Sequence, residues 1–333
     1  MIIDAHSHGL HGGYLDRLAE AGGEWAKKRI DNIRRRARSL PVLLDVPLRI
    51  EQLERNGIDF QVVTHQAISI DVNFFPGDPD TRLAMARALN DNMARLMEDS
   101  KGRLIAAGTV PLASYEHGGR AELERAIQAL GLKAINLPTN VKGTPLDLPE
   151  YELFWTDAEA LDVTVYLHPY PQPGRSYEAA WDLPHTFGWP YETTLALSRL
   201  VFSGIMERHP RLKIVGHHLG GGMIPFFMGR IVESHDPTTV AEHPVLDLPR
   251  PLFDYFSRFY LDTAVGGSAA AIRCAYEVFG ADRILFATDA PNGPGAGESR
   301  LQSYATLVKS LALPAEDTEK ILSGNIRRIL NLE

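Results

Sequence analysis

The 333-residue chain is almost without cysteine, since Cys274 is the only one. One cysteine excludes a disulfide within the chain, and we therefore expect a protein of the reducing cytoplasm. No apolar run approaches the roughly 18 residues that a membrane-spanning helix needs. The first residues also lack the basic and apolar regions of a secretory signal. The sequence thus predicts no membrane partner.

Positive charge is scarce as well. The chain has 34 Lys and Arg against 42 Asp and Glu, which gives a net charge of -8. Nucleic-acid binding needs clustered basic side chains, so we expect no nucleic-acid partner. One basic run, KKRIDNIRRRAR at residues 27–38, is interpreted as the solvent-exposed face of a helix, with a partner-binding site as the alternative.

Short β-rich runs recur along the whole chain, with helical patterns between them. They are residues 2–7, 58–64, 103–110, 132–138, 163–168, 213–218, 258–263 and 283–289. Strands that alternate with helices predict parallel β-α-β units, and eight such units favour a single (β/α)8 barrel domain over residues 1–333. A doubly wound open sheet is the alternative, which the lack of G-x-G-x-x-G after the first strand disfavours.

Three connections depart from this regular pattern. Residues 9–45 and 169–192 are insertions after strands one and five, and residues 290–299 are rich in Gly and Pro. All three follow the carboxyl ends of strands, which is the face where barrel enzymes build their active sites.

Side chains of metal-binding types lie at the carboxyl ends of several predicted strands. His6 and His8 lie on the first strand, His168 ends the fifth and Asp289 ends the eighth. A divalent transition metal needs three or four nitrogen or oxygen donors within about 2.0–2.2 Å. Because side chains alternate along a strand, His6 and His8 share one face, and Asp4 shares it one step deeper. We expect a metal site there, with Asp4 as a supporting residue behind the ligands.

With these residues in view, the sequence resembles the amidohydrolase superfamily. It is most similar to the branch named for aminocarboxymuconate-semialdehyde decarboxylase. The resemblance covers nearly the whole chain, and the motifs that carry it are DAHSH, LRIEQLERNGIDFQVV, GLKAINLPTNVKG, KIVGHHLGGG, ADRILFATDAP and SGNIRRILNL.

The resemblance implies a distorted barrel that holds one divalent metal per chain. Its ligand positions match His6, His8, His168 and Asp289, so that Asp289 is both a ligand and a catalytic group. Zn2+ is the expected ion and Mn2+ the alternative, since His and Asp ligands suit both. The predicted fourth strand, LKAINLPTN, lacks a lysine at its end, which favours a mononuclear site.

The predicted sixth strand ends in two histidines, and the resemblance implies that one of them transfers a proton. His218 is preferred because Leu219 and two glycines follow it directly. His217 is expected on the opposite face of the strand, where it would support or pack against the site. Because the two histidines are adjacent in the sequence, His217 remains the alternative for the proton-transfer group.

Candidate substrate contacts come partly from the resemblance and partly from loop positions. Arg49 resembles a residue that binds a substrate carboxylate, and Arg230 one that reaches the site of a neighbouring subunit, which implies a homodimer. His65 follows the second strand and is a further candidate. His185 and Trp189 stand in the loop where the decarboxylases of this branch carry an aromatic residue in an L-P-W-like stretch.

Together these features predict a metal-dependent, non-oxidative decarboxylase of an aromatic or unsaturated carboxylic acid, a small-molecule substrate. The alternative is a hydrolase or hydratase that uses the same site on a lactone, an amide or a conjugated acid, because a fold does not fix its chemistry.

Overall fold

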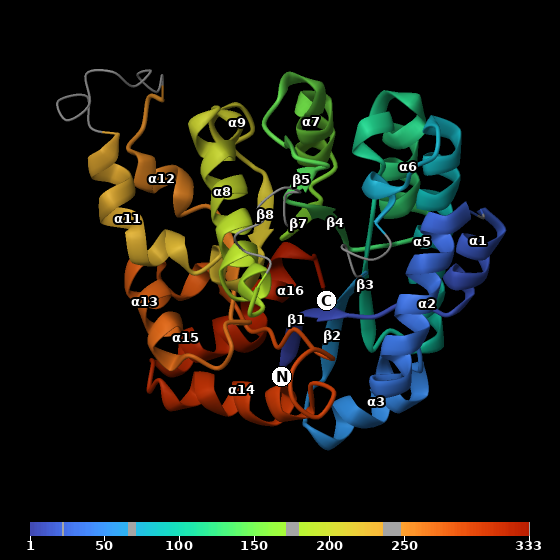
Figure 1. Cartoon of the computed structure of the whole chain (residues 1–333). Coiled ribbons are helices and arrows are strands. Elements are labelled where there is room, and N and C mark those ends of the chain that lie inside the picture. Colours follow the sequence, from blue (N-terminus) through green and yellow to red (C-terminus); the bar gives the residue numbers. More distant parts are fainter. Residues whose placement is uncertain (22, 66–70, 171–179, 236–247, 333) are drawn as a thin grey trace.

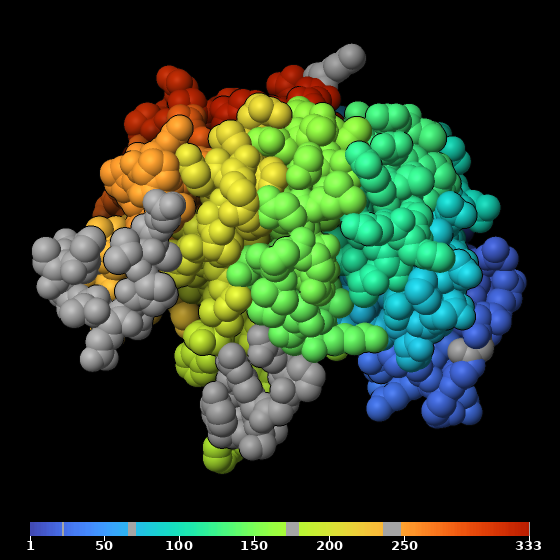
Figure 2. All heavy atoms as spheres, turned by 90° about the horizontal axis from the view of Figure 1, so that it is seen from above, coloured from blue at the N-terminus to red at the C-terminus, as the bar shows by residue number. Residues whose placement is uncertain are grey.

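A ring of parallel strands forms the centre of the molecule, and helices surround it (Figure 1). The computed structural model describes residues 1–21, 23–65, 71–170, 180–235 and 248–332. Viewed from above, successive parts of the chain follow one another around the molecule (Figure 2). Within the described residues, no helix combines the length and the apolar character that crossing a membrane requires.

Eight strands pair in parallel in the order in which the chain visits them, and all eight predicted strands are confirmed. Their bounds are β1 Ile3–His8, β2 Phe60–Thr64, β3 Leu104–Gly108, β4 Ala134–Pro138, β7 Thr164–His168, β8 Lys213–Gly216, β9 Tyr260–Asp262 and β10 Ile284–Leu285. A small antiparallel hairpin that the sequence did not predict joins β5 Asn140–Val141 to β6 Thr144–Pro145. The (β/α)8 architecture is thereby confirmed.

The ring closes between β1 and the segment that follows β10. Ala5 N donates to Phe286 O at 2.7 Å, Asp289 N donates to His6 O at 2.9 Å, and His8 N donates to Ala290 O at 2.7 Å. These bonds, with a parallel bridge between Ser7 and Ala290, join the first strand of the sheet to the segment after the last one. This closure also brings residues from the two ends of the sequence side by side.

The helices follow the strands around the outside. They are α1 Gly13–Ala21, α2 Gly23–Ser39, α3 Val46–Arg55, α5 Pro79–Asp99, α6 Arg120–Glu124, α7 Glu152–Ala160, α8 Trp189–Phe202, α9 Ile205–Arg208, α10 His217–Gly220, α11 Met223–Ser234, α12 Leu252–Phe256, α13 Ala269–Phe279, α14 Glu298–Ser310, α15 Ala315–Glu319 and α16 Asn325–Ile329. Short 3-10 or π turns link them, namely η1 Pro41–Leu43, η2 Val72–Phe74, η3 Leu112–Ser114, η4 Tyr115–Gly119, η5 Arg125–Ala129, η6 Pro149–Tyr151, η8 Pro184–Gly188, η9 Ala281–Arg283 and η10 Lys320–Gly324. The stretch predicted as an insertion after strand one contains α1 and α2, whereas residues 171–179 of the other insertion lie outside the described residues.

The apolar core has two layers, as expected for a barrel. The inner cluster fills the ring with side chains such as Val62, Ala107, Tyr166 and Leu285, and residues of α16 pack against it. The larger outer cluster lies between the strands and the helices. Apolar side chains thus fill much of the inside of the barrel, and the candidate metal-binding side chains lie at its carboxyl end.

A buried polar network centred on Arg49 ties α3 to the strands. Arg49 is 3% exposed, and it donates from Nε to Gln61 Oε1 at 2.7 Å, from Nη1 to His8 O at 2.6 Å and from Nη2 to Ser7 Oγ at 2.8 Å. Gln61 Nε2 in turn donates to Asp4 Oδ2 at 2.7 Å. A buried guanidinium with such partners holds neighbouring elements together, because losing it would leave buried acceptors unpaired.

We therefore expect Arg49→Met to lower the free energy of unfolding by about 3 kcal/mol or more, since three buried acceptors lose their donor. Urea denaturation measures this change. Arg55→Met on the same helix is the matched control, because Arg55 is 56% exposed and lies 3.5 Å from Glu298. Arg55→Met should lower the free energy of unfolding by less than about 1 kcal/mol. If Arg49→Met kept its stability and lost only substrate affinity, the structural role would be refuted.

Candidate metal centre and active site

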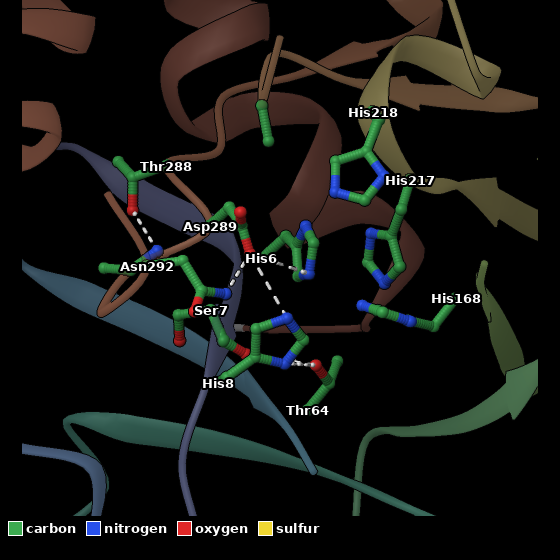
Figure 3. Close-up of polar contacts among 12 residues, drawn as sticks. His6, Ser7, His8, Thr64, His168, His217, His218, Thr288, Asp289 and Asn292 are labelled. Carbon is green, nitrogen blue, oxygen red and sulfur yellow. Dashed lines mark hydrogen bonds and ion pairs between the residues drawn. The ribbon is translucent and has the colours of Figure 1, made fainter. Parts of the chain in front are cut away.

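Three histidines converge at the carboxyl end of the barrel (Figure 3). His6 and His8 come from β1 and His168 ends β7, and each offers a ligand atom within 4.8 Å of the others. The ring centres of His6 and His8 lie 4.9 Å apart, and those of His8 and His168 lie 5.0 Å apart. All three side chains are buried.

Hydrogen bonds fix two of these rings. His168 Nδ1 lies 3.0 Å from Pro169 O, and because a carbonyl can only accept, Nδ1 carries the proton and Nε2 the lone pair. His8 Nδ1 lies 3.1 Å from the Thr64 hydroxyl, which leaves Nε2 toward the cluster. Among the described residues, the buried Nε2 atoms of His6 and His168 have no hydrogen-bond partner. Buried nitrogens of this kind need a partner, and a metal ion supplies one.

Asp289 completes the cluster from the segment after β10. Its Oδ1 lies 3.2 Å from His8 Nε2 and 4.0 Å from His6 Nε2. Its Oδ2 accepts from Arg300 Nη1 at 2.8 Å. One oxygen thus faces the imidazoles while the other is held by a guanidinium. Three imidazoles and one carboxylate oxygen form a donor set that fits a divalent metal.

Asp262, at the end of β9, connects the histidines from behind. Its Oδ2 lies 3.1 Å from His6 Nδ1 and 2.7 Å from His217 Nδ1, and its Oδ1 accepts from His218 N at 2.9 Å. The sequence did not assign a role to Asp262. Its position at a strand end was the signal that could have indicated one.

Both histidines after β8 face the cluster, so the expectation that His217 lies on the opposite face is wrong. The ring of His217 stacks on that of His6 with centres 3.4 Å apart, and the ring of His218 lies 6.0 Å from that of His168. The alternation stops because β8 ends at Gly216 and because His218 and Leu219 have φ of 56° and 59°. His217 is fully buried, whereas His218 lines the cavity above the cluster.

Asp4 supports the site by holding the segment that leads to Asp289. The pairing of β1 with β2 shifts register between Asp4 and Ser7, which interrupts simple alternation. The Asp4 carboxylate accepts from Thr288 N at 2.9 Å and from Thr288 Oγ1 at 2.5 Å. It thereby holds the residue that precedes Asp289.

A cavity of about 1020 Å³ lies over the cluster, and His8, His168, His218 and Asp289 reach it. Of the predicted substrate contacts, His185 and Trp189 line it, with ring centres 4.0 Å apart.

The other three predicted substrate contacts are not among the lining residues of this cavity. Arg49 is held in the network described above. His65 is buried, and its Nε2 lies 2.9 Å from Asp71 Oδ2. Arg230 is exposed on α11. The sequence missed Arg36 and Arg300, which do line the cavity. The interpretation of residues 27–38 as a solvent-exposed face is wrong for Arg36, because this residue of α2 lines the cavity.

Burial controls protonation in the cluster. It lowers the pKa values of His6, His168 and His217 well below their ordinary 6.5, and neighbouring imidazoles lower them further. Burial also raises the pKa of Asp4 to about 6, although hydrogen bonds from Thr288 and Gln61 oppose this rise. The imidazoles of His6, His168 and His217 are therefore neutral near pH 7, which is the form of histidine that binds metals.

We expect the metal-free protein to lose stability as the pH falls from about 7 to 5.5. In this range the unfolded chain takes up protons at the three imidazoles and the folded chain does not. Asp4 has the opposite effect on stability, because its raised pKa lets the folded chain bind a proton in this range. It is one carboxylate against three imidazoles, so the loss of stability should prevail. Urea denaturation after chelation measures how the free energy of unfolding changes with pH. His217→Gln should reduce this dependence, whereas the control His117→Gln, at an exposed histidine, should not. A flat profile would contradict the burial effect.

Comparison with known proteins identifies the family to which this chain belongs. A family model for amidohydrolases matches residues 3–332. The chain is 30% identical over 293 residues to 2-amino-3-carboxymuconate-6-semialdehyde decarboxylase of Dictyostelium discoideum, which covers 87% of this chain and 77% of that protein. It is 32% identical over 305 residues to gamma-resorcylate decarboxylase of Rhizobium sp., which covers 87% of this chain and 89% of that protein.

A solved structure shares the whole fold. It is a dihydroxybenzoic acid decarboxylase from Polaromonas sp. with bound manganese and the inhibitor 2-nitroresorcinol. The TM-score is 0.79 at 27% identity, and the match covers 99% of this chain and 97% of that chain. The resemblance drawn from the sequence motifs is thus confirmed, and the chain belongs to the amidohydrolase family.

Proposed function

We propose that this protein is a metal-dependent, non-oxidative decarboxylase of an aromatic or unsaturated carboxylic acid. The observation that carries the proposal is the cluster of three imidazoles and one carboxylate at the floor of a cavity whose wall includes Trp189 and His185. The decarboxylase names of the relatives support the same reaction class. We also propose that residues 1–333 work as one barrel domain.

His6, His8, His168 and Asp289 would hold one divalent ion. We propose Zn2+ because three imidazoles suit it, and the manganese in the Polaromonas enzyme makes Mn2+ the other candidate. Such an ion supplies Lewis-acid polarisation of a bound oxygen when it is present.

The chain's own residues would orient the acid and move the proton. Trp189 offers an aromatic face against which a planar substrate can lie. His218, held through its backbone N–H by Asp262, would deliver a proton to the carbon that bears the carboxylate. The bond between that carbon and the carboxylate then breaks, its electron pair returns to the substrate, and CO2 leaves. His217 is fully buried behind His6, so it would support this arrangement.

CO2 release from a panel of hydroxybenzoic and unsaturated carboxylic acids tests the reaction class. At least one acid should release CO2, and chelation should abolish the release. Turnover of lactones or amides with no CO2 from any acid would refute the proposal and favour the hydrolase alternative.

Paired variants test the assignment of the proton donor. We expect His218→Asn to lower kcat by about 100-fold or more at unchanged metal content, because general acid catalysis contributes roughly that much. His217→Asn should mainly lower stability and metal occupancy, because it loses a contact with Asp262 and stacking on His6. If His217→Asn lost turnover at full occupancy while His218→Asn kept it, the two roles would be reversed.

We further propose a homodimer in which Arg230 reaches the partner's site. Arg230 is exposed on α11, and Phe226 and Phe227 on the same helix are 72% and 40% exposed. Exposed aromatic side chains beside an arginine are typical of interface positions.

The cytoplasmic location stays a prediction that depends on the single cysteine.

Subunit mixing tests this proposal. Arg230→Ala and His168→Ala proteins should each be inactive, and a mixture should recover about a quarter of the wild-type rate. The reason is that half of randomly mixed dimers are heterodimers with one complete site. Sedimentation measures the assembly and CO2 release the activity. A monomeric protein, or a mixture with no recovered activity, would refute the role of Arg230 in trans.

A further inference from the structure

The backbone of His218 determines where its imidazole lies. The bond that ties this residue to β9 runs from His218 N to Asp262 Oδ1 at 2.9 Å, so it holds the main chain and not the ring. Among the described residues, the buried Nδ1 of the ring has no hydrogen-bond partner. The place of the imidazole above the cluster therefore depends on the conformation of the chain around it.

Residues 218–222 form a left-handed turn shortly after the end of β8. His218 and Leu219 have φ of 56° and 59° with ψ of 48° and 41°, and the three glycines after them have φ of 63°, 79° and 71°. Gly221 N donates to His217 O at 3.1 Å and closes the turn. Residues with a Cβ atom disfavour this conformation, so the surrounding fold must hold His218 and Leu219 in it.

Helix α8 packs directly against the left-handed turn. Thr194 Oγ1 donates to Gly220 O at 3.2 Å. A Cβ atom at Gly221 would collide with Pro190 O and with Thr194 Oγ1, so only glycine lets the turn come this close to the helix. Two contacts of different kinds, a hydrogen bond and close packing, thus hold the turn on the first half of α8.

We propose that Thr194 is a positioning residue, which acts on His218 through the left-handed turn. Its hydroxyl fixes the turn on α8, and the same helix carries Trp189, whose ring centre lies 6.4 Å from that of His218. The helix would thus fix the distance between the proton donor and the wall against which the substrate lies. The inference deepens the proposed function and rests on it for the role of His218.

Turnover of the acid that releases CO2 fastest in the panel tests this role. We expect Thr194→Val, which removes the hydroxyl and keeps the branched shape, to lower kcat by about 10-fold or more, because a misplaced donor slows the chemical step. KM should change by less than about 2-fold, since Trp189 and the cluster keep their places. Thr194→Ser keeps the hydroxyl and should restore kcat to within about 3-fold of the wild type.

NMR of the histidine rings in the zinc-loaded protein gives a second readout that needs no turnover. The ring signals of His218 are assigned by their loss in His218→Asn. Thr194→Val should shift or split these signals, because the turn that carries the imidazole is no longer fixed on α8. Thr194→Ser should return them to their wild-type positions.

Thr193→Val is the matched control, since the hydroxyl of this buried neighbour donates within α8, to Trp189 O at 3.4 Å. It should leave kcat, KM and the His218 signals as in the wild type. An unchanged kcat in Thr194→Val, or a change confined to KM, would overturn the role of Thr194. A loss that Thr194→Ser does not restore, or that Thr193→Val shares, would do so too. If no acid released CO2 while Thr194→Val alone moved the His218 signals, the positioning role would stand and the decarboxylase proposal alone would fail.

Discussion

The closure of the barrel between β1 and the segment after β10 is the constraint on which the site depends. Asp289 N donates to His6 O, and His8 N donates to Ala290 O, so the backbones of these three candidate ligands are bonded to the opposite segment. A slip of one residue in this pairing would turn the side chains to the other face. The contacts of Asp4 with Thr288 reinforce this register from below. The positions of His6, His8 and Asp289 are therefore properties of the closed barrel and not of either segment alone.

A second constraint acts from the opposite side of the cluster. Asp262 contacts His6, His217 and the backbone of His218, and thus ties three imidazole-bearing residues to β9. Burial keeps the pKa values of His6 and His217 low. Neutral imidazoles with fixed tautomers can bind a cation with little rearrangement of their side chains.

The site divides into a deep part and an outer part. Side chains from the strands form the floor, where the register of the sheet fixes their positions. Helices and loops supply the wall, with Arg36 from α2, Trp189 from α8 and Arg300 from α14. In barrels the outer parts vary without disturbing the core, which is how one floor can serve different acids.

The sequence by itself determined the eight strands, the barrel and the placing of His6, His8 and His168 on strands and of Asp289 beyond the last one, because the patterns that mark strands are local signals. It did not reveal which neighbours each side chain meets. Arg49 looked like a substrate contact, yet tertiary packing buries it against Gln61 and Ser7. Arg36 looked like solvated surface, yet α2 folds back over the site. His217 faces the cluster because positive φ angles after Gly216 end the alternation. Contacts between residues hundreds of positions apart depend on how the barrel closes, and only the tertiary structure decides that.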